Sequence, residues 1–136
     1  MGESQSHTKL VKEIVTWICH NHLQGDSGYI FADLPENPPS KKTPVINNYI
    51  PDVFVPGSSG VAFIIGEAKT ARDFETRHTK SQIEAFLRRC ALTDKGILII
   101  AVPWDLVRSA RSLINKLKIE VDANNVEVIV LEKLCG

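Results

Sequence analysis

Two acidic residues and a lysine, Asp52, Glu67 and Lys69, are the side chains of this sequence whose types and spacing best suit chemistry. Asp52 opens a β-rich stretch, and Glu67 and Lys69 end a second apolar stretch that follows a turn rich in Pro, Gly and Ser at 56–60. This pattern predicts a β-hairpin. Because side chains alternate along a strand, Glu67 and Lys69 share one face and Ala68 points away. Two carboxylates and an amine at one end of a hairpin predict a site for a divalent metal ion and a polarised water.

Helices and strands must position these residues, and the spacing of apolar residues predicts them. We expect three helices, over 6–23, 79–92 and 104–118. We expect strands over 29–34, 52–55, 61–66, 96–102 and 126–131, with a stiff proline-rich loop over 35–44. The run 96–102 is continuously apolar, which is typical of a strand buried on both faces.

The order of these elements predicts an α/β fold in a single domain over residues 1–136. Strands alternate with helices after Glu67, which favours parallel, right-handed crossovers. We therefore expect a central mixed five-stranded sheet flanked by helices, in the order α-β-β-β-α-β-α-β.

Composition excludes several classes of protein. The 136 residues are 43% apolar, which is inconsistent with disorder, and the 16 basic and 16 acidic residues give a net charge of zero. A protein that coats nucleic acid without specificity would be more basic, so any nucleic-acid contact must come from local patches. The three cysteines lie far apart without metal-ligand spacing, which favours a reduced, cytoplasmic protein. No apolar run approaches the ~18 residues of a transmembrane helix, so we expect no membrane partner.

Pro51-Asp52, Glu67-Ala68-Lys69 and Gln82 in the following helix resemble the PD-(D/E)XK nuclease superfamily, which has the restriction-endonuclease-like fold. Glu13, in the first helix, looks like the upstream acid of many members. The compact size and the series of residues are most similar to small Holliday-junction-resolvase-like nucleases of archaea and phages, which leaves a phage or viral origin open. The resemblance covers roughly residues 6–102 and departs from the pattern at the polar insertion 72–76.

The resemblance implies a Mg²⁺-dependent deoxyribonuclease that hydrolyses phosphodiester bonds, with selectivity for junctions, flaps or ends left open. It implies that the catalytic residues are Asp52, Glu67, Lys69 and Gln82, and that the metal ligands are Glu13, Asp52, Glu67 and the carbonyl of Ala68. Hard oxygen ligands favour Mg²⁺ or Mn²⁺ over zinc. The metal would acidify an attacking water and neutralise charge on the phosphate, while Lys69 and Gln82 would orient the water or the phosphate.

Basic residues near this motif are candidates for phosphate contacts, with ordinary solvated faces as the alternative. The candidates are Arg72, Arg77, His78 and Lys80 around the second helix, and Lys41 and Lys42 in the proline-rich loop. A homodimer is expected because cutting two strands is easiest with two symmetric sites. The strand 126–131 or the helix that begins at Trp104 could provide the contact.

Two other functions remain open. A catalytically silent nucleic-acid-binding or subunit-interaction module on the same fold would have no need to bind a divalent metal. A generic α/β domain would leave Asp52, Glu67 and Lys69 apart in space. Taken singly, Glu13 and Gln82 are also typical of solvated helix faces, and Glu67 with Lys69 of a weak surface ion pair.

Overall fold

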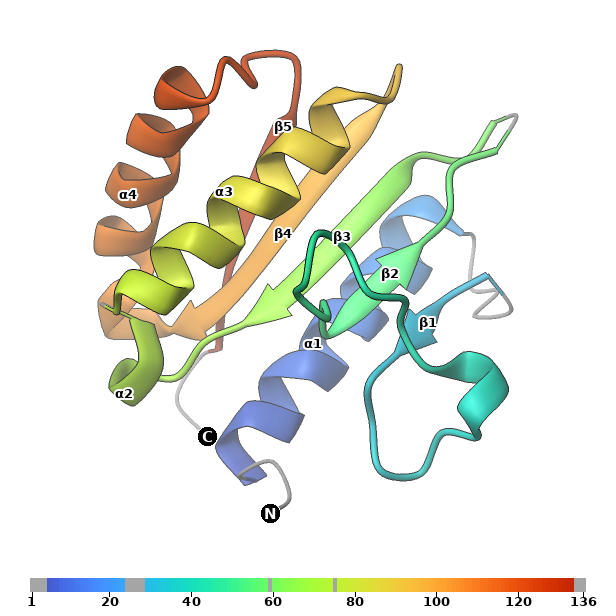
Figure 1. The fold of residues 1–136 in the computed structure, drawn as a ribbon. Coiled ribbons are helices and arrows are strands. Elements are labelled where there is room, and N and C mark those ends of the chain that lie inside the picture. The colour runs from blue at the N-terminus through green and yellow to red at the C-terminus, as the bar shows by residue number, and fades with distance from the viewer. Residues whose placement is uncertain (1–4, 24–28, 59, 75, 134–136) are drawn as a thin grey trace.

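A mixed five-stranded sheet forms the centre of the computed structural model, which describes residues 5–23, 29–58, 60–74 and 76–133 (Figure 1). The strands lie in sequence order: β1 (Phe31–Ala32), β2 (Val53–Val55), β3 (Phe63–Ala68), β4 (Gly96–Pro103) and β5 (Glu127–Lys133). Strands β1, β2 and β3 pair antiparallel, whereas β3, β4 and β5 pair parallel. The predicted α/β class and mixed five-stranded sheet are confirmed.

Helices cover both faces of this sheet (Figure 1). Helix α1 (Gln5–His22) packs on one face through the buried side chains Leu10, Val11, Ile14 and Ile18, whose spacing forms one stripe. Helices α3 (Arg77–Ala91) and α4 (Val107–Glu120) pack on the other face, each following a parallel strand. The sheet therefore separates two hydrophobic cores, and β4 is buried on both sides, as its continuous apolar sequence predicts.

Several predicted boundaries were wrong. Strand β1 covers two residues of the six predicted, and the polar insertion contains a short helix, α2 (Ala71–Phe74). Helix α3 begins at Arg77 instead of Thr79, because the Thr76 side chain accepts a hydrogen bond of 3.0 Å from the Thr79 N–H and so caps the helix. Short 3₁₀ turns η1 (Pro39–Lys41) and η2 (Trp104–Leu106) lie in the proline loop and before α4.

One end of the molecule gathers the ends of several elements. The carboxyl ends of β3 and β4, the start of β2 and the first turns of α1 and α3 all lie at the lower end in Figure 1. In open α/β sheets, the crevice beyond the carboxyl ends of the strands is the usual place for a ligand. No described helix is long and apolar enough to cross a membrane.

Candidate active site

Asp52, Glu67 and Lys69 lie together at the carboxyl end of β3. The N–H of Asp52 donates a hydrogen bond of 3.1 Å to Glu67 Oε1, and Lys69 Nζ lies 3.3 Å from Glu67 Oε2. The N–H of Ala68 donates a bond of 2.8 Å to Asp52 Oδ2. The three predicted residues are therefore linked through the hairpin, which excludes the hypothesis that they lie apart.

The alternation of β3 sets the directions of these side chains. Ile65 faces the core under α3 and α4, while Ala68 belongs to the core under α1. The Lys69 N–H continues the ladder with a bond of 3.0 Å to the Ala101 carbonyl, so Glu67 and Lys69 follow Ile65 toward α3. This confirms that Glu67 and Lys69 share one face and that Ala68 points away.

Proline at the start of β2 changes the pairing of the hairpin at this point. Val53 pairs with Gly66, so extending the register by two residues places Pro51 opposite Ala68. Because proline has no N–H, Pro51 cannot donate to the Ala68 carbonyl. The Ala68 N–H binds the Asp52 carboxylate. The Ala68 carbonyl thereby loses its ladder donor, which suits its predicted role as a metal ligand.

The site is more deeply buried than a strand end in solvent would be. Taken over the whole residue, the exposed fractions are 6% for Asp52, 3% for Glu67 and 8% for Lys69. Burial, and next the charge of Asp52, raise the pKa of the Glu67 carboxyl well above its usual range, although Lys69 acts in the opposite direction. The two buried acids are thus neighbours, and Lys69 lies beside Glu67, an arrangement that an added cation would stabilise.

Helix α1 reaches the site through His7, a residue that the sequence interpretation did not select. His7 Nε2 lies 3.1 Å from Asp52 Oδ2, the same oxygen that accepts the Ala68 N–H. The sequence did indicate that His7 lies on the buried face of this helix, because His7 stands three, four and seven residues before the buried Leu10, Val11 and Ile14. Glu13, the residue of α1 that the resemblance favoured, is exposed.

Gln82 is buried on α3, the helix toward which Glu67 and Lys69 point. Its Oε1 atom has no hydrogen-bond partner among the described residues. A buried acceptor without a donor costs free energy, and a bound water or ligand would supply the missing donor. The predicted role of Gln82 in orienting water or phosphate fits this unpaired oxygen.

The donor set fits Mg²⁺ in one specific form. Within the described residues, no three His, Cys, Asp or Glu side chains are grouped so that they could hold a metal ion, and Glu13 completes no such group with Asp52 and Glu67. Magnesium is typically held by one or two carboxylates, with waters and substrate phosphate completing its shell. Asp52, Glu67 and the Ala68 carbonyl therefore fit as its protein ligands, and Mn²⁺ would fit the same oxygens.

The candidate phosphate-binding residues lie in different settings. Arg77 and Lys80 are exposed near the start of α3, and they line a groove of about 400 Å³ with Phe74, Thr76, Ser109 and Leu113. His78 is exposed, and its ring meets Tyr49 edge-on at 5.4 Å between centroids. The side chain of Arg72 lies outside the described part of the structure.

The two lysines of the proline loop already have intramolecular contacts. Lys42 Nζ donates to the Leu34 carbonyl and lies 3.9 Å from Asp33 Oδ1. Lys41 Nζ lies 5.4 Å from the centroid of the Phe31 ring. These contacts stabilise the loop, so a phosphate would compete with them.

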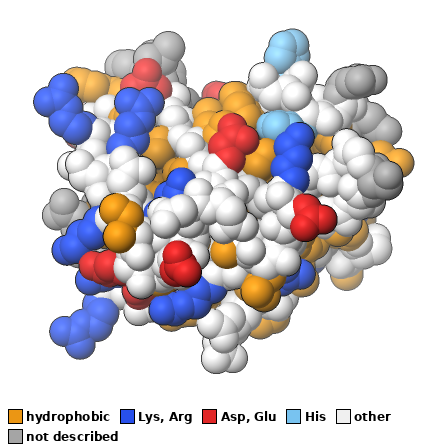
Figure 2. All heavy atoms as spheres, turned by 90° about the horizontal axis from the view of Figure 1, so that it is seen from above, with side chains coloured by type: hydrophobic (Ala, Val, Ile, Leu, Met, Phe, Trp, Pro, Cys, Tyr) orange, Lys and Arg blue, Asp and Glu red, His pale blue; other side chains and the backbone are white. Residues whose placement is uncertain are grey.

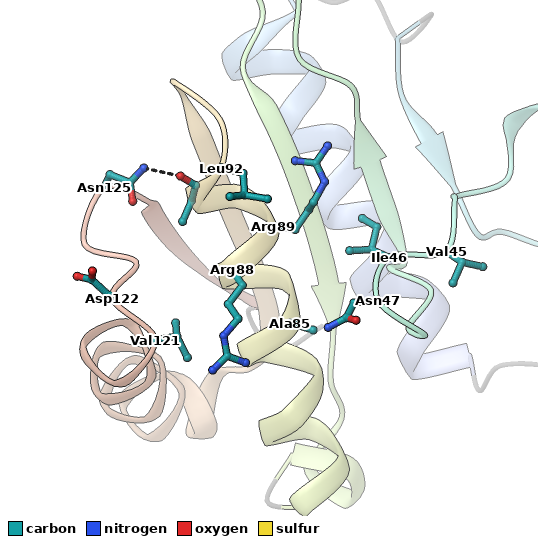
Figure 3. A pocket seen from close by; sticks show the side chains of 11 residues that line it. Val45, Ile46, Asn47, Ala85, Arg88, Arg89, Leu92, Val121, Asp122 and Asn125 are labelled. Carbon is teal, nitrogen blue, oxygen red and sulfur yellow. Dashed lines mark hydrogen bonds between the residues drawn. The ribbon is translucent and has the colours of Figure 1, made fainter.

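Another cavity, of about 700 Å³, does not have Asp52, Glu67 or Lys69 among its lining residues (Figure 3). It is lined by Val45, Ile46, Asn47, Ala85, Arg88, Arg89, Ala91, Leu92, Val121, Asp122 and Asn125. Arg88 and Arg89 point apart in Figure 3, and Arg89 lies over the Phe63 ring at 4.4 Å. Acidic and basic side chains intermingle on the face of the molecule at this end (Figure 2).

Comparison with family models, curated proteins and solved structures gave no significant match to this chain. The resemblance to the PD-(D/E)XK nucleases therefore rests on the motif residues and their placement.

Proposed function

We propose that this protein is a Mg²⁺-dependent deoxyribonuclease whose active site is formed by Asp52, Glu67, Lys69 and Gln82. The observation that carries the proposal is the hydrogen-bonded link between the two acids, in which the Asp52 N–H binds Glu67 and the Asp52 carboxylate binds the Ala68 N–H. This link holds two carboxylates and a lysine at the carboxyl end of a buried strand, where catalytic groups are held most precisely.

Each residue has a role that follows from its geometry. When bound by Asp52, Glu67 and the Ala68 carbonyl, Mg²⁺ would acidify a water and neutralise charge on the phosphate. The Lys69 ammonium, 3.3 Å from Glu67 Oε2, is placed to donate to a non-bridging phosphate oxygen or to the attacking water. Gln82 would accept a hydrogen bond from water at its unpaired Oε1.

Cleavage of DNA with Mg²⁺ tests this proposal. We expect the purified chain to cut at least one member of a panel of junction, flap, duplex and single-stranded DNAs, and Asp52→Asn and Glu67→Gln to abolish the cut. The matched control is Glu36→Gln, which removes an exposed carboxylate paired with Lys12 at 3.4 Å. Cleavage that persists at the wild-type rate in both site variants would show that the active site lies elsewhere.

We propose DNA as the partner, with the groove beside Arg77 and Lys80 guiding the phosphate backbone toward the site. This groove lies at the start of α3, the end of the molecule that holds the carboxylates. We also propose a homodimer that places two sites on one substrate, and a cytoplasmic location, which suits the free thiols of Cys19 and Cys90.

A catalytically silent binding module is the second candidate. The observation that favours it is the burial of Glu67, since a substrate phosphate would need access to a side chain that is 3% exposed. Titration of the wild-type protein with Mg²⁺ separates the two candidates. Heat of binding that Glu67→Gln removes supports the nuclease, and its absence supports the silent module.

A further inference from the structure

Strand β5 leaves one long edge of the sheet unpaired. Within the described residues, β5 pairs only with β4, through a register that runs from Glu127 to Lys133. The opposite edge strand, β1, has only two residues. A long edge without a proline is a template for pairing with another strand.

The hydrogen bonds of the sheet show which residues of β5 point their backbone groups outward. The N–H of Phe63 binds the Lys95 carbonyl and that of Lys69 binds the Ala101 carbonyl, so the odd-numbered residues of β4 face β3. The even-numbered residues of β4 therefore face β5, where they bond to its odd-numbered residues. The outward-pointing residues of β5 are the even-numbered Val128, Val130 and Glu132.

The side chains along this edge are apolar on both faces of the sheet. Val128 and Val130 are half-buried against the core under α3 and α4, and Ile129 and Leu131 against the core under α1. A groove of about 340 Å³ follows the strand and is lined by Arg111, Asn115, Val128, Ile129 and Val130. Arg111 therefore places an exposed positive charge beside the outward-pointing valines.

We propose that two copies of this chain dimerise by antiparallel pairing of β5 with β5 about a twofold axis at Val130. A strand is complementary to itself under such an axis. In this register Val130 lies opposite its own copy and Val128 opposite Glu132 of the second copy, so all three outward-pointing residues are paired and about six backbone hydrogen bonds form. The two sheets become one continuous sheet.

Charge complementarity supports this particular register. Residues directly opposite each other share a face of the sheet, so Glu132 of the second copy lies on the face of Val128, where Arg111 lines the groove. Arg111 can thus form an ion pair with Glu132 of the second copy, and the twofold axis repeats this pair. On the other face, Ile129 lies opposite Leu131 of the second copy, which extends the core under α1 across the interface.

Sedimentation of the whole chain, without DNA or metal, tests the interface independently of nuclease activity. We expect a monomer–dimer equilibrium between about 1 and 100 µM. Arg111→Glu and Glu132→Arg should each weaken dimerisation about tenfold, because each places like charges together at two symmetric positions. The double charge reversal should restore the dimer. Arg108→Glu, an exposed change on the same helix outside the groove, is the control.

A proline provides a second test that keeps the fold. The Val130 N–H points outward, so Val130→Pro removes donors of the interface and none of the bonds between β4 and β5. We expect a folded monomer by circular dichroism and sedimentation. A wild-type protein that stays monomeric over the whole range, or a dimer unaffected by both the charge reversals and the proline, would overturn the proposal.

Discussion

His7 Nε2 lies 3.1 Å from Asp52 Oδ2 and so joins the first turn of α1 to the start of β2, across 45 residues of sequence. The same oxygen accepts the N–H of Ala68 at 2.8 Å. The Asp52 carboxylate is therefore held from the helix and from the neighbouring strand before any ligand binds. Such preorganisation is what a metal-binding or catalytic carboxylate requires.

Removing the imidazole tests this contact. We expect His7→Ala to lower the free energy of unfolding by about 1–3 kcal/mol, because a buried carboxylate loses a hydrogen-bond partner. Urea denaturation at neutral pH measures the change. His20→Ala removes an exposed histidine from the same helix and should stay within about 0.5 kcal/mol of wild type. Equal losses in the two variants would mean that the His7–Asp52 contact contributes nothing specific.

The raised pKa of Glu67 predicts how stability depends on pH. The folded protein holds this proton at pH values where the unfolded chain has lost it, so stability falls as the pH rises from the ordinary carboxyl range through the raised pKa. Glu67→Gln should remove this dependence, so that its thermal midpoint relative to wild type increases between pH 5 and 8. Melting curves in EDTA measure the difference. A constant difference across that range would contradict a raised pKa.

Addition of Mg²⁺ should reverse the effect in the wild-type protein. A cation that binds only the folded state raises the thermal midpoint, by an amount that grows with its concentration. We expect the wild-type midpoint to rise with millimolar Mg²⁺ at pH 7.5 and that of Glu67→Gln to stay constant. The Glu36→Gln variant, which keeps the site intact, should respond as wild type does.

Lys69 should stabilise the fold only when Glu67 is ionised. Their side chains are 10% and 4% exposed, so Lys69→Met leaves a buried carboxylate without its cation and should cost about 3–5 kcal/mol at pH 8. The cost should shrink as the pH falls, because Glu67, whose pKa is raised, then takes up a proton and loses the charge that Lys69 compensates. The cost should also be smaller when Lys69→Met is introduced into Glu67→Gln. Lys12→Met, which breaks an exposed pair with Glu36, should cost less than about 1 kcal/mol. Urea denaturation at pH 8 and at pH 5 compares wild type, Lys69→Met, Glu67→Gln, the double variant and Lys12→Met.

Gly66 allows α1 to pack closely on β3. A Cβ atom at this position would lie 2.7 Å from Ile14 Cγ2 and 3.1 Å from Val53 Cβ. We expect Gly66→Ala to destabilise the protein by about 1–3 kcal/mol through overpacking. Because Ile14→Ala removes the closest atom, the double variant should be more stable than the sum of the single losses predicts. Strict additivity in chemical denaturation would contradict this close contact.

DNA binding should depend strongly on salt although the net charge is zero. Each phosphate neutralised by a side chain contributes about one unit to the slope of log affinity against log salt. Replacing Arg77 and Lys80 together with glutamine should flatten that slope by about one unit for each phosphate that is no longer neutralised, and equally for junction and duplex. Arg88 and Lys95, exposed near the opposite end, provide the matched control pair. An unchanged slope in the Arg77 and Lys80 variant would place the DNA path elsewhere.

Local backbone geometry explains how much could be predicted from the sequence. The four-residue spacing of Leu10, Ile14 and Ile18 predicts a helix, and the unbroken apolar run of β4 predicts a buried strand. The linkage of Asp52 with Glu67 was also predictable, because a turn of a few residues brings the two ends of a hairpin together. Alternation along β3 then places Glu67 and Lys69 on one face.

The packing of separate layers decided the rest. His7 carried a periodic signal, but only the angle and depth at which α1 lies on the sheet bring its ring to Asp52 instead of bringing Glu13. The burial of the acids, and hence the raised pKa of Glu67, depends on segments far away in sequence that cover the end of the sheet. Periodicity describes each element by itself, whereas desolvation and contacts between helix and strand are properties of the assembled layers.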